Sequence, residues 1–144
     1  MRENSEFLAA YKGGFINMLR WHEFDDLLTT LGEQSNSDWF LYAVGEVPPT
    51  EPSSVDEIER FLQEIEQLIR NDHDEDYCGI VYSDHRDSPN FVKFYDPNNL
   101  GASCGSSGSH VFPGWIMCQM PPEDLKVAFP IPGNRRRWWK KLFG

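Results

Sequence analysis

One short segment places a thiol and an imidazole close together among glycines and serines. It spans residues 102–110, with the sequence ASCGSSGSH, and contains Cys104 and His110. A cysteine acts as a nucleophile when a nearby base or positive field stabilises its thiolate, and glycine-rich backbone can present amides to an oxyanion. The segment has neither the Gly-Lys-Ser/Thr of a phosphate-binding loop nor the Gly-x-Ser-x-Gly of a nucleophile elbow. It therefore predicts either a mobile connection between strands or the catalytic loop of a small thiol-dependent enzyme.

The C-terminal end combines positive charge with indole rings. Three arginines and two lysines flank a pair of tryptophans in the last ten residues. Tryptophan and arginine are typical anchors of protein interfaces, and the same mixture suits an anionic membrane surface or single-stranded nucleic acid. So short a segment does not form a stable isolated helix, so it can also fold back on its own domain or stay disordered. The residues expected to contact a partner are Arg135, Arg136, Arg137, Trp138, Trp139, Lys140 and Lys141.

Charge is strongly segregated along the chain. The 144 residues have a net charge of −10, but residues 1–134 carry −15 and the last ten residues carry +5. An acidic body repels phosphate groups unless the tail stands clear by more than a Debye length of about 8 Å. A nucleic-acid-binding domain should also present a basic face. We therefore expect a protein partner or self-association, rather than nucleic acid or a membrane surface.

The chain also contains donors of the kind that bind zinc. Cys78, Cys104, His110 and Cys118 are soft ligands, but no Cys-x-x-Cys pair occurs among them. Cys78 and Cys118 lie in apolar runs, where cysteine packs as a small hydrophobic residue. These residues are not expected to form a metal site.

An acidic run over residues 72–76 (DHDED) alternates like a calcium-binding loop. However, the position that requires glycine holds Tyr77, and the position of the closing acid holds Ser83. The run is therefore expected to be a solvated connection, and no metal or cofactor is predicted.

The clearest predicted element is a helix over residues 55–70. Ser54 and Glu57 form a capping-box pattern, in which the hydroxyl and the carboxylate satisfy each other's backbone amides. The pairs Asp56–Arg60 and Glu66–Arg70 have the spacing of i,i+4 ion pairs. Seven apolar residues follow one stripe of this helix: Val55, Ile58, Phe61, Leu62, Ile65, Leu68 and Ile69.

Weaker patterns predict the other elements. A short apolar stripe over residues 7–11 predicts a helix that ends at Gly13-Gly14, and a second helix is expected around residues 24–31 with its stop at Gly32. Residues 15–19 are compatible with a helix start or a short strand. Apolar runs predict strands over residues 39–44, 78–83, 91–95 and 115–119. The first run is apolar on both faces, which is typical of a central strand.

The runs 78–83 and 91–95 predict a hairpin with Ser83 opposite Phe91. That register places Tyr82 on the same face as Val92, and Ser83 on the same face as Lys93. The remaining members of the Tyr82 face would be Cys78, Ile80 and Phe94.

These elements, in the order α-α-β-α-β-β-β, predict an α+β class. We expect a mainly antiparallel sheet of about four strands with two or three helices packed on it. Residues 1–126 would form a single acidic domain, and residues 127–144 a Pro-containing linker and a basic, aromatic tail. The N-terminal residues lack the apolar stretch of a secretory signal, and three cysteines do not make a disulfide framework. A cytoplasmic protein with reduced thiols is therefore expected.

The predicted function is a non-enzymatic protein-binding or accessory module that uses its basic, Trp-rich tail as the contact element. Two alternatives stay open. One is a thiol-dependent enzyme that uses Cys104 and His110, and the other is a structural subunit of a larger complex. The sequence does not identify a substrate or a partner.

Overall fold

The protein is described by a computed structural model that covers residues 6–99, 112–125, 138–140 and 142. Within these residues, five strands form one antiparallel sheet in the order β1-β3-β4-β5-β2. The strands are β1 (Ile16–Asn17), β2 (Phe40–Ala43), β3 (Val81–Ser83), β4 (Phe91–Phe94) and β5 (Trp115–Cys118). The helical elements are α1 (Glu6–Tyr11), α2 (Trp21–Glu33), α3 (Val55–Asp72) and the 3-10 turn η1 (Pro97–Asn99). The predicted α+β class is confirmed, although the sheet has five strands rather than four.

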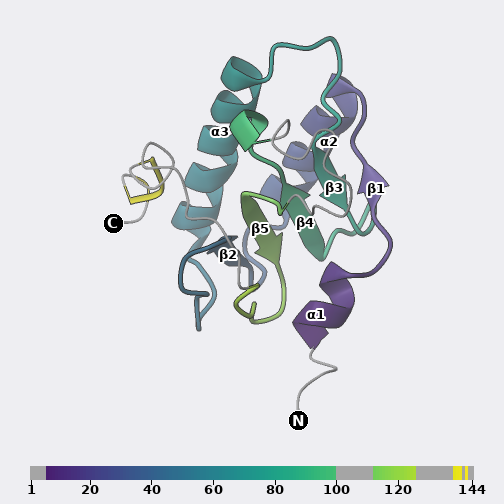
Figure 1. Ribbon diagram of the computed structural model, residues 1–144. Helices are drawn as coiled ribbons and strands as arrows, with labels where there is room; N and C mark the ends of the chain where they lie inside the picture. The colour runs from purple at the N-terminus through teal and green to yellow at the C-terminus, as the bar shows by residue number, and fades with distance from the viewer. Residues whose placement is uncertain (1–5, 100–111, 126–137, 141, 143–144) are drawn as a thin grey trace.

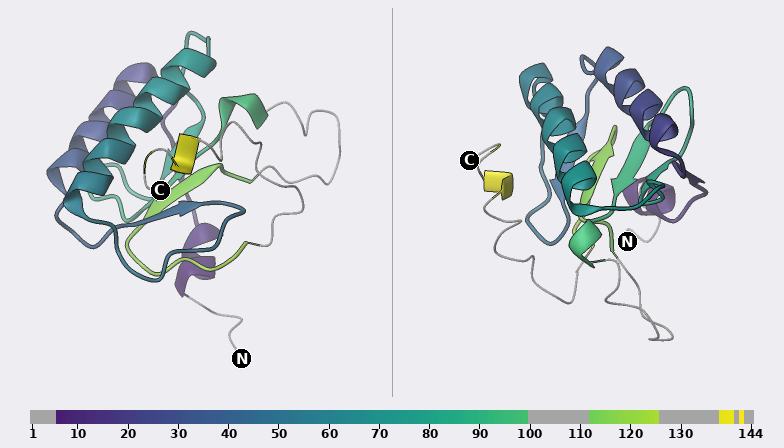
Figure 2. Two further views of the ribbon diagram at one scale, coloured as in Figure 1. Left: turned by 90° about the vertical axis from the view of Figure 1, so that its left-hand side faces the viewer. Right: turned by 90° about the horizontal axis from the view of Figure 1, so that it is seen from above.

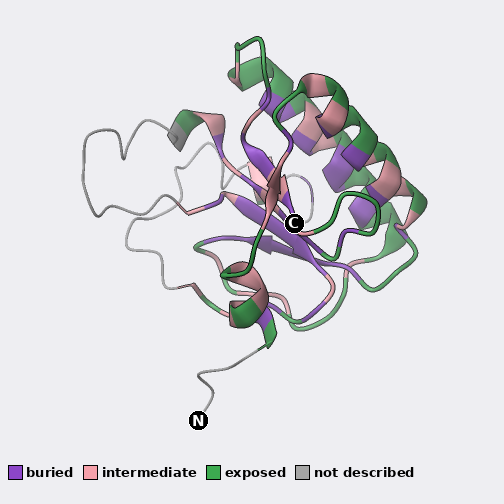
Figure 3. Ribbon diagram, turned by 90° about the vertical axis from the view of Figure 1, so that its right-hand side faces the viewer, coloured by how far each residue is buried: buried purple, intermediate pink, exposed green. Residues whose placement is uncertain are grey.

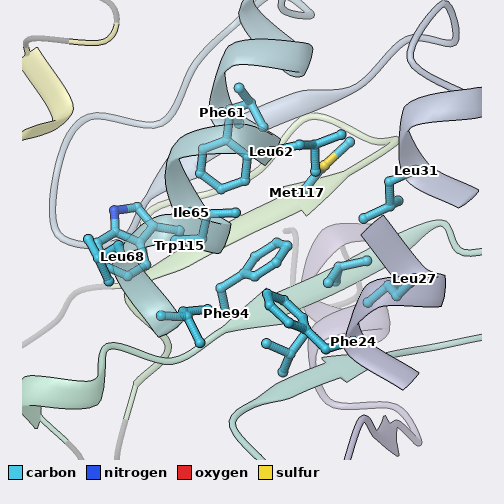
Figure 4. Packing of buried hydrophobic residues seen from close by; sticks show 14 of the residues in the cluster. Phe24, Leu27, Leu31, Phe61, Leu62, Ile65, Leu68, Phe94, Trp115 and Met117 are labelled. Atoms are coloured by element: carbon cyan, nitrogen blue, oxygen red, sulfur yellow. The ribbon is translucent and has the colours of Figure 1, made fainter. Parts of the chain in front are cut away.

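The helices lie on both faces of the sheet (Figures 1 and 2). The long helices α2 and α3 cover one face and enclose the larger core, in which Figure 4 shows Phe24 and Phe61 packed over Phe94 and Trp115. The short helix α1 covers part of the opposite face, where its Phe7 packs among side chains of β2, β4 and β5. The burial pattern in Figure 3 follows this arrangement, with the sheet buried between the two layers.

The predicted signals at the start of α3 are confirmed. The Ser54 hydroxyl accepts from the Glu57 amide at 3.1 Å, and the Glu57 carboxylate accepts from the Ser54 amide at 2.8 Å. The helix continues to Asp72, two residues beyond the predicted end. Arg70 pairs with Glu66 at 3.1 Å and also with Asp25 of α2, so it ties the two long helices together.

The predicted hairpin forms with a register that differs by one residue from the expected one. Ser83 pairs with Val92, and Tyr82 pairs with Lys93. The connecting loop sets this register, because the Asp84 carboxylate accepts from the amides of both Asn90 and Phe91. A shift of one residue moves a side chain to the other face of a sheet. Tyr82 therefore lies on the same face of the sheet as Lys93, the face that α1 covers. Ser83 lies on the other face, which α2 and α3 cover, and is buried there.

The apolar strand β2 is not central, as the sequence suggested, but lies at an edge of the sheet. Its four residues are nevertheless all buried. The reason is that both helical layers and the flanking chain extend over it: Leu41 and Ala43 lie in the larger core, and Phe40 and Tyr42 lie in the smaller one. Burial on both faces therefore does not distinguish a central strand from a covered edge.

None of the described helices is long and apolar enough to cross a lipid bilayer.

Candidate functional site

The C-terminal segment, defined here as residues 138–140 and 142, lies against the protein's own domain. It flanks α3 on the side away from α2 (Figures 1 and 2). Trp138 and Trp139 are half-buried and pack against the larger core, whereas Lys140 is exposed. Of the residues predicted to contact a partner, Arg135, Arg136, Arg137 and Lys141 lie outside the described part of the chain.

Ring contacts hold the two indoles in place. Trp138 packs edge to face against Trp115 of β5, with ring centroids 5.2 Å apart. Trp139 makes the same kind of contact with Phe61 of α3 at 6.2 Å. Edge-to-face aromatic pairs contribute about 0.5–1.5 kcal/mol each beyond the burial of their area. The described indoles therefore belong to the outer layer of the fold.

Leu142 completes the docking of the C-terminal segment. Its side chain is buried, and its carbonyl oxygen accepts a long hydrogen bond of 3.4 Å from the Arg60 guanidinium of α3. The contact surface lies beside the most acidic part of the molecule, since residues 21–76 hold 16 acidic and two basic residues. The positive charge of the tail is therefore complementary to the negative charge of the helical layer beside which the segment lies.

Cys104 and His110, the residues of the alternative thiol chemistry, lie outside the described residues. The other two cysteines are free thiols and are buried. Burial raises the pKa of the Cys118 thiol to about 12 and also raises the pKa of Cys78. Because the thiolate is the reactive form, neither of these cysteines is suited to nucleophilic chemistry at neutral pH.

The acidic run after α3 does not assemble a cation site. Among the described residues, no group of three or more His, Cys, Asp or Glu side chains is placed to hold a metal ion. His73 instead makes a hydrogen bond of 2.8 Å through Nε2 to the Cys78 carbonyl. The Trp21 indole donates to the Glu75 carbonyl at 3.1 Å, so the run is fastened to the start of α2.

A shallow surface hollow opens beside this connection. Its lining mixes apolar, aromatic and oppositely charged side chains, and two of them, Leu19 and Tyr77, are about half exposed. This mixture of side chains does not indicate any one class of ligand. The complete lining is Leu19, Arg20, Trp21, His22, Asp76 and Tyr77.

On the α1 face of the sheet, Lys93 of β4 lies in an aromatic cage that the sequence analysis did not identify. Its Nζ lies 4.1 Å from the ring centroid of Tyr11 and 4.0 Å from that of Phe15. The ammonium donates to the Tyr11 carbonyl at 2.8 Å, at the end of α1. Desolvation by burial lowers the pKa of Lys93 to about 8, and burial also raises the pKa of Tyr11 to about 12.

Polar side chains continue from Lys93 across the neighbouring strands. Tyr82 is its partner on β3, and Asn17 is the partner of Tyr82 on β1. The Asn17 amide donates to the Tyr82 hydroxyl at 3.2 Å. Tyr95, just beyond the end of β4, packs edge to face against Tyr82 at 5.6 Å. Lysine in an apolar strand was the only signal in the sequence, and the incorrect hairpin register separated it from Tyr82.

Comparison of the chain with protein-family models, with curated proteins and with solved structures gives no match. The function proposed below therefore rests on the residues and their geometry.

Proposed function

We propose that this chain is a protein-binding module and not an enzyme, and that its C-terminal segment is the contact element. The observation that carries the proposal is the half-buried position of Trp138 and Trp139 on α3 and β5, beside the exposed Lys140. Such a segment lies on the surface of the domain, where it can leave its position without opening the main core.

The strength of the docking is compatible with release. The contacts are two edge-to-face ring pairs, one buried leucine and one long hydrogen bond. Such contacts amount to a few kcal/mol before the entropy of ordering the segment is subtracted. A partner that offers better contacts to the same residues can therefore compete with the docked state.

The short connection between the domain and the C-terminal segment determines which kind of partner can compete with the docked state. Twelve residues join Leu125 to Trp138. A tether of this length keeps the segment near its own surface at an effective concentration of about 1 mM. A second copy of the chain offers only the same surface, so it loses this competition at any chain concentration well below about 1 mM. The proposed partner is therefore another protein with an acidic, aromatic-lined surface that engages the five basic residues of the tail as well as the indoles.

Site-specific photo-crosslinking in cells tests this proposal on the full chain. The variant Lys140→p-benzoylphenylalanine places the crosslinker at an exposed position of the contact element, and Val47→p-benzoylphenylalanine serves as a control because Val47 is 88% exposed. We expect a discrete protein adduct from position 140 and no such adduct from position 47.

Two further variants separate partner binding from adventitious contact. The adduct should disappear in Trp138→Ala/Trp139→Ala and also in Arg135→Ala/Arg136→Ala/Arg137→Ala, because the proposed partner recognises both indoles and charge. Crosslinking that stays within the chain, or an adduct that persists in both variants, would contradict the proposal and leave the segment as ordinary outer packing.

A further inference from the structure

The outer edge of β1 carries backbone groups that pair with no described residue. β1 is the first strand in the order of the sheet, and no described helix or strand lies beyond it (Figures 1 and 3). The Met18 amide donates to the Val81 carbonyl at 2.8 Å, and the Met18 carbonyl accepts from the Gly79 amide at 3.0 Å. Because the N–H and C=O groups of successive strand residues point alternately to opposite sides, those of Asn17 and Phe15 point away from β3. This edge therefore offers backbone donors and acceptors to another strand.

The hollow beside the acidic run begins where this edge ends. Leu19, the second residue after β1, lines the hollow together with Tyr77, and both side chains are about half exposed. They are neighbours, since both reach within 4 Å of the position that a Cβ on Gly79 would occupy. Small molecules normally lose most of their surface to a pocket, and a shallow hollow does not provide this enclosure. It suits one apolar side chain of a longer segment that the adjacent strand edge holds in place.

Charge along this stretch of chain distinguishes between the segments that could pair with it. Residues 12–22 contain Lys12 and Arg20 and no acid, in a chain with a net charge of −10. Both side chains are exposed, and neither forms an ion pair in the described part of the chain. A second copy of the chain would bring the same two cations to the edge, whereas an acidic segment would attract them. Charge complementarity therefore favours an acidic segment of another protein over self-association.

We propose that the outer edge of β1 binds an extended, acidic segment of another protein as an additional strand of the sheet. The backbone of the segment pairs with the outward groups of Asn17 and Phe15, and one apolar side chain enters the hollow beside Leu19. In this mode of recognition, main-chain hydrogen bonds supply affinity and side-chain pockets supply specificity. β1 and the edge strand β2 lie at opposite ends of the sheet, and the C-terminal segment packs on α3 and β5. The proposal therefore does not depend on the role proposed for that segment.

A purely protective arrangement of this edge makes different predictions. Natural sheets avoid pairing at their edges by means of short edge strands and exposed charges, and β1 has both features. If protection were the whole role of Lys12 and Arg20, no segment would add to β1. Replacing these cations with neutral residues would then only increase aggregation. Measurements of peptide binding therefore distinguish the two roles.

The probe is a short peptide selected on the full chain from a random phage-displayed library that lacks Lys and Arg. Excluding basic residues prevents capture by the acidic surface of α2 and α3. We expect enriched peptides that alternate apolar and polar residues and carry negative charge. Only alternate amides of an added strand face β1, so methylation of the peptide nitrogens should weaken binding about tenfold at every second position and little in between. No enrichment, or methylation effects without this alternation, overturns the proposal.

Hydrogen exchange locates the selected peptide on the full chain. The Asn17 amide faces outward and should exchange fast in the free chain, whereas the Met18 amide is bonded to Val81 and should exchange slowly. Saturating peptide should slow exchange at Asn17 by about tenfold or more. Unchanged exchange at Asn17 overturns the proposal, because the peptide then binds elsewhere. Protection of Asn17 that rises with chain concentration without peptide also overturns it, because a second copy then occupies the edge.

A matched pair of variants tests the backbone contact. Asn17→Pro removes the outward N–H, and proline is tolerated at such positions of edge strands. Asn17→Ala also loses the side-chain hydrogen bond to Tyr82 but keeps the N–H. Folded Asn17→Pro, verified by near-ultraviolet circular dichroism, should bind the peptide about tenfold more weakly than Asn17→Ala. Equal affinity of the two variants overturns the proposal.

A second pair of variants tests the charge. Arg20→Gln should weaken binding of the acidic peptide about threefold, because it removes one cation beside the edge. Gln63→Glu, at an exposed position of α3, makes the same change in net charge away from β1 and should leave the affinity unchanged. The difference between the variants should decrease at high salt. Equal effects of the two substitutions would overturn the assignment of an acidic ligand to this edge.

Discussion

Trp138 of the C-terminal segment packs edge to face against Trp115 of β5, with their ring centroids 5.2 Å apart. Trp115 lies on the same face of the sheet as the residues that contact α3. The end of the chain and the last strand therefore meet at the margin of the larger core. The C-terminal segment adds to the layer formed by α2 and α3 and is in contact with the domain rather than free of it.

This contact predicts that truncation destabilises the domain. Removing residues 135–144 should lower the free energy of unfolding by about 2–4 kcal/mol, because buried Leu142 and the two ring contacts are lost. Urea denaturation followed by circular dichroism measures the change. Lys140→Ala is the control, and an exposed lysine should alter stability by less than about 0.5 kcal/mol. A truncated protein as stable as the full chain would show that the segment does not dock in solution.

Elements with strong local patterns could be predicted from the sequence. The capping box at Ser54 and the apolar stripe of α3 specify a helix that forms as expected. The short strand β1 could not be assigned, because two residues carry no periodicity, and its pairing depends on β3 far along the chain. The apolar pattern of β3 and β4 could not predict their register either, because the Asp84 side chain in the connecting loop sets it.

The candidate sites were predictable to a smaller extent. The unusual composition of the C-terminal end drew attention to Trp138 and Trp139, but nothing in the sequence identified Phe61 and Trp115 as the residues that receive them. The aromatic cage of Lys93 joins the end of α1, the residue before β1, and β4. Such a site depends on contacts between distant segments, and a local pattern does not encode them.

Alkylation of the three cysteines tests the alternative thiol chemistry. Cys78 and Cys118 should react only slowly with iodoacetamide in the folded protein, because burial raises the pKa of both thiols. If the chain is a binding module, Cys104 should behave as an ordinary thiol, with a reactivity that follows a pKa near 8.5. Peptide mapping by mass spectrometry measures each rate. Fast alkylation of Cys104 below pH 7 that is lost in His110→Ala would instead support the enzyme.

The lysine in the aromatic cage predicts a rise in stability with pH. Its pKa is about 8 in the folded protein, below its ordinary value of 10.5. Below pH 8 Lys93 is protonated in both the folded and the unfolded protein, and the folded protein carries the full desolvation cost of this half-buried charge. Between pH 8 and pH 10.5 the folded state has released a proton that the unfolded state still holds, so this group makes folding more favourable as the pH rises.

The measurement is the difference in free energy of unfolding between the native chain and Lys93→Met at pH 8 and pH 10. Groups that do not contact Lys93 cancel in this difference, including Cys118, whose raised pKa acts in the opposite direction at high pH. The native chain should gain stability relative to the variant over this range. A difference that stays constant with pH would mean that Lys93 is not desolvated in solution.

Two glycines predict opposite effects of the same substitution. Gly79 has a φ of +72° in the turn before β3, and an added Cβ would lie 3.1 Å from the ring of Tyr77. Because L side chains disfavour this conformation, Gly79→Ala should destabilise the protein by about 1–2 kcal/mol. Gly32 lies within α2 with no atom within 4 Å of an added Cβ, so Gly32→Ala should stabilise it by about 0.5–1 kcal/mol. Urea midpoints that shift in opposite directions would support both local geometries, and a neutral Gly79→Ala would argue against the left-handed turn that leads into β3.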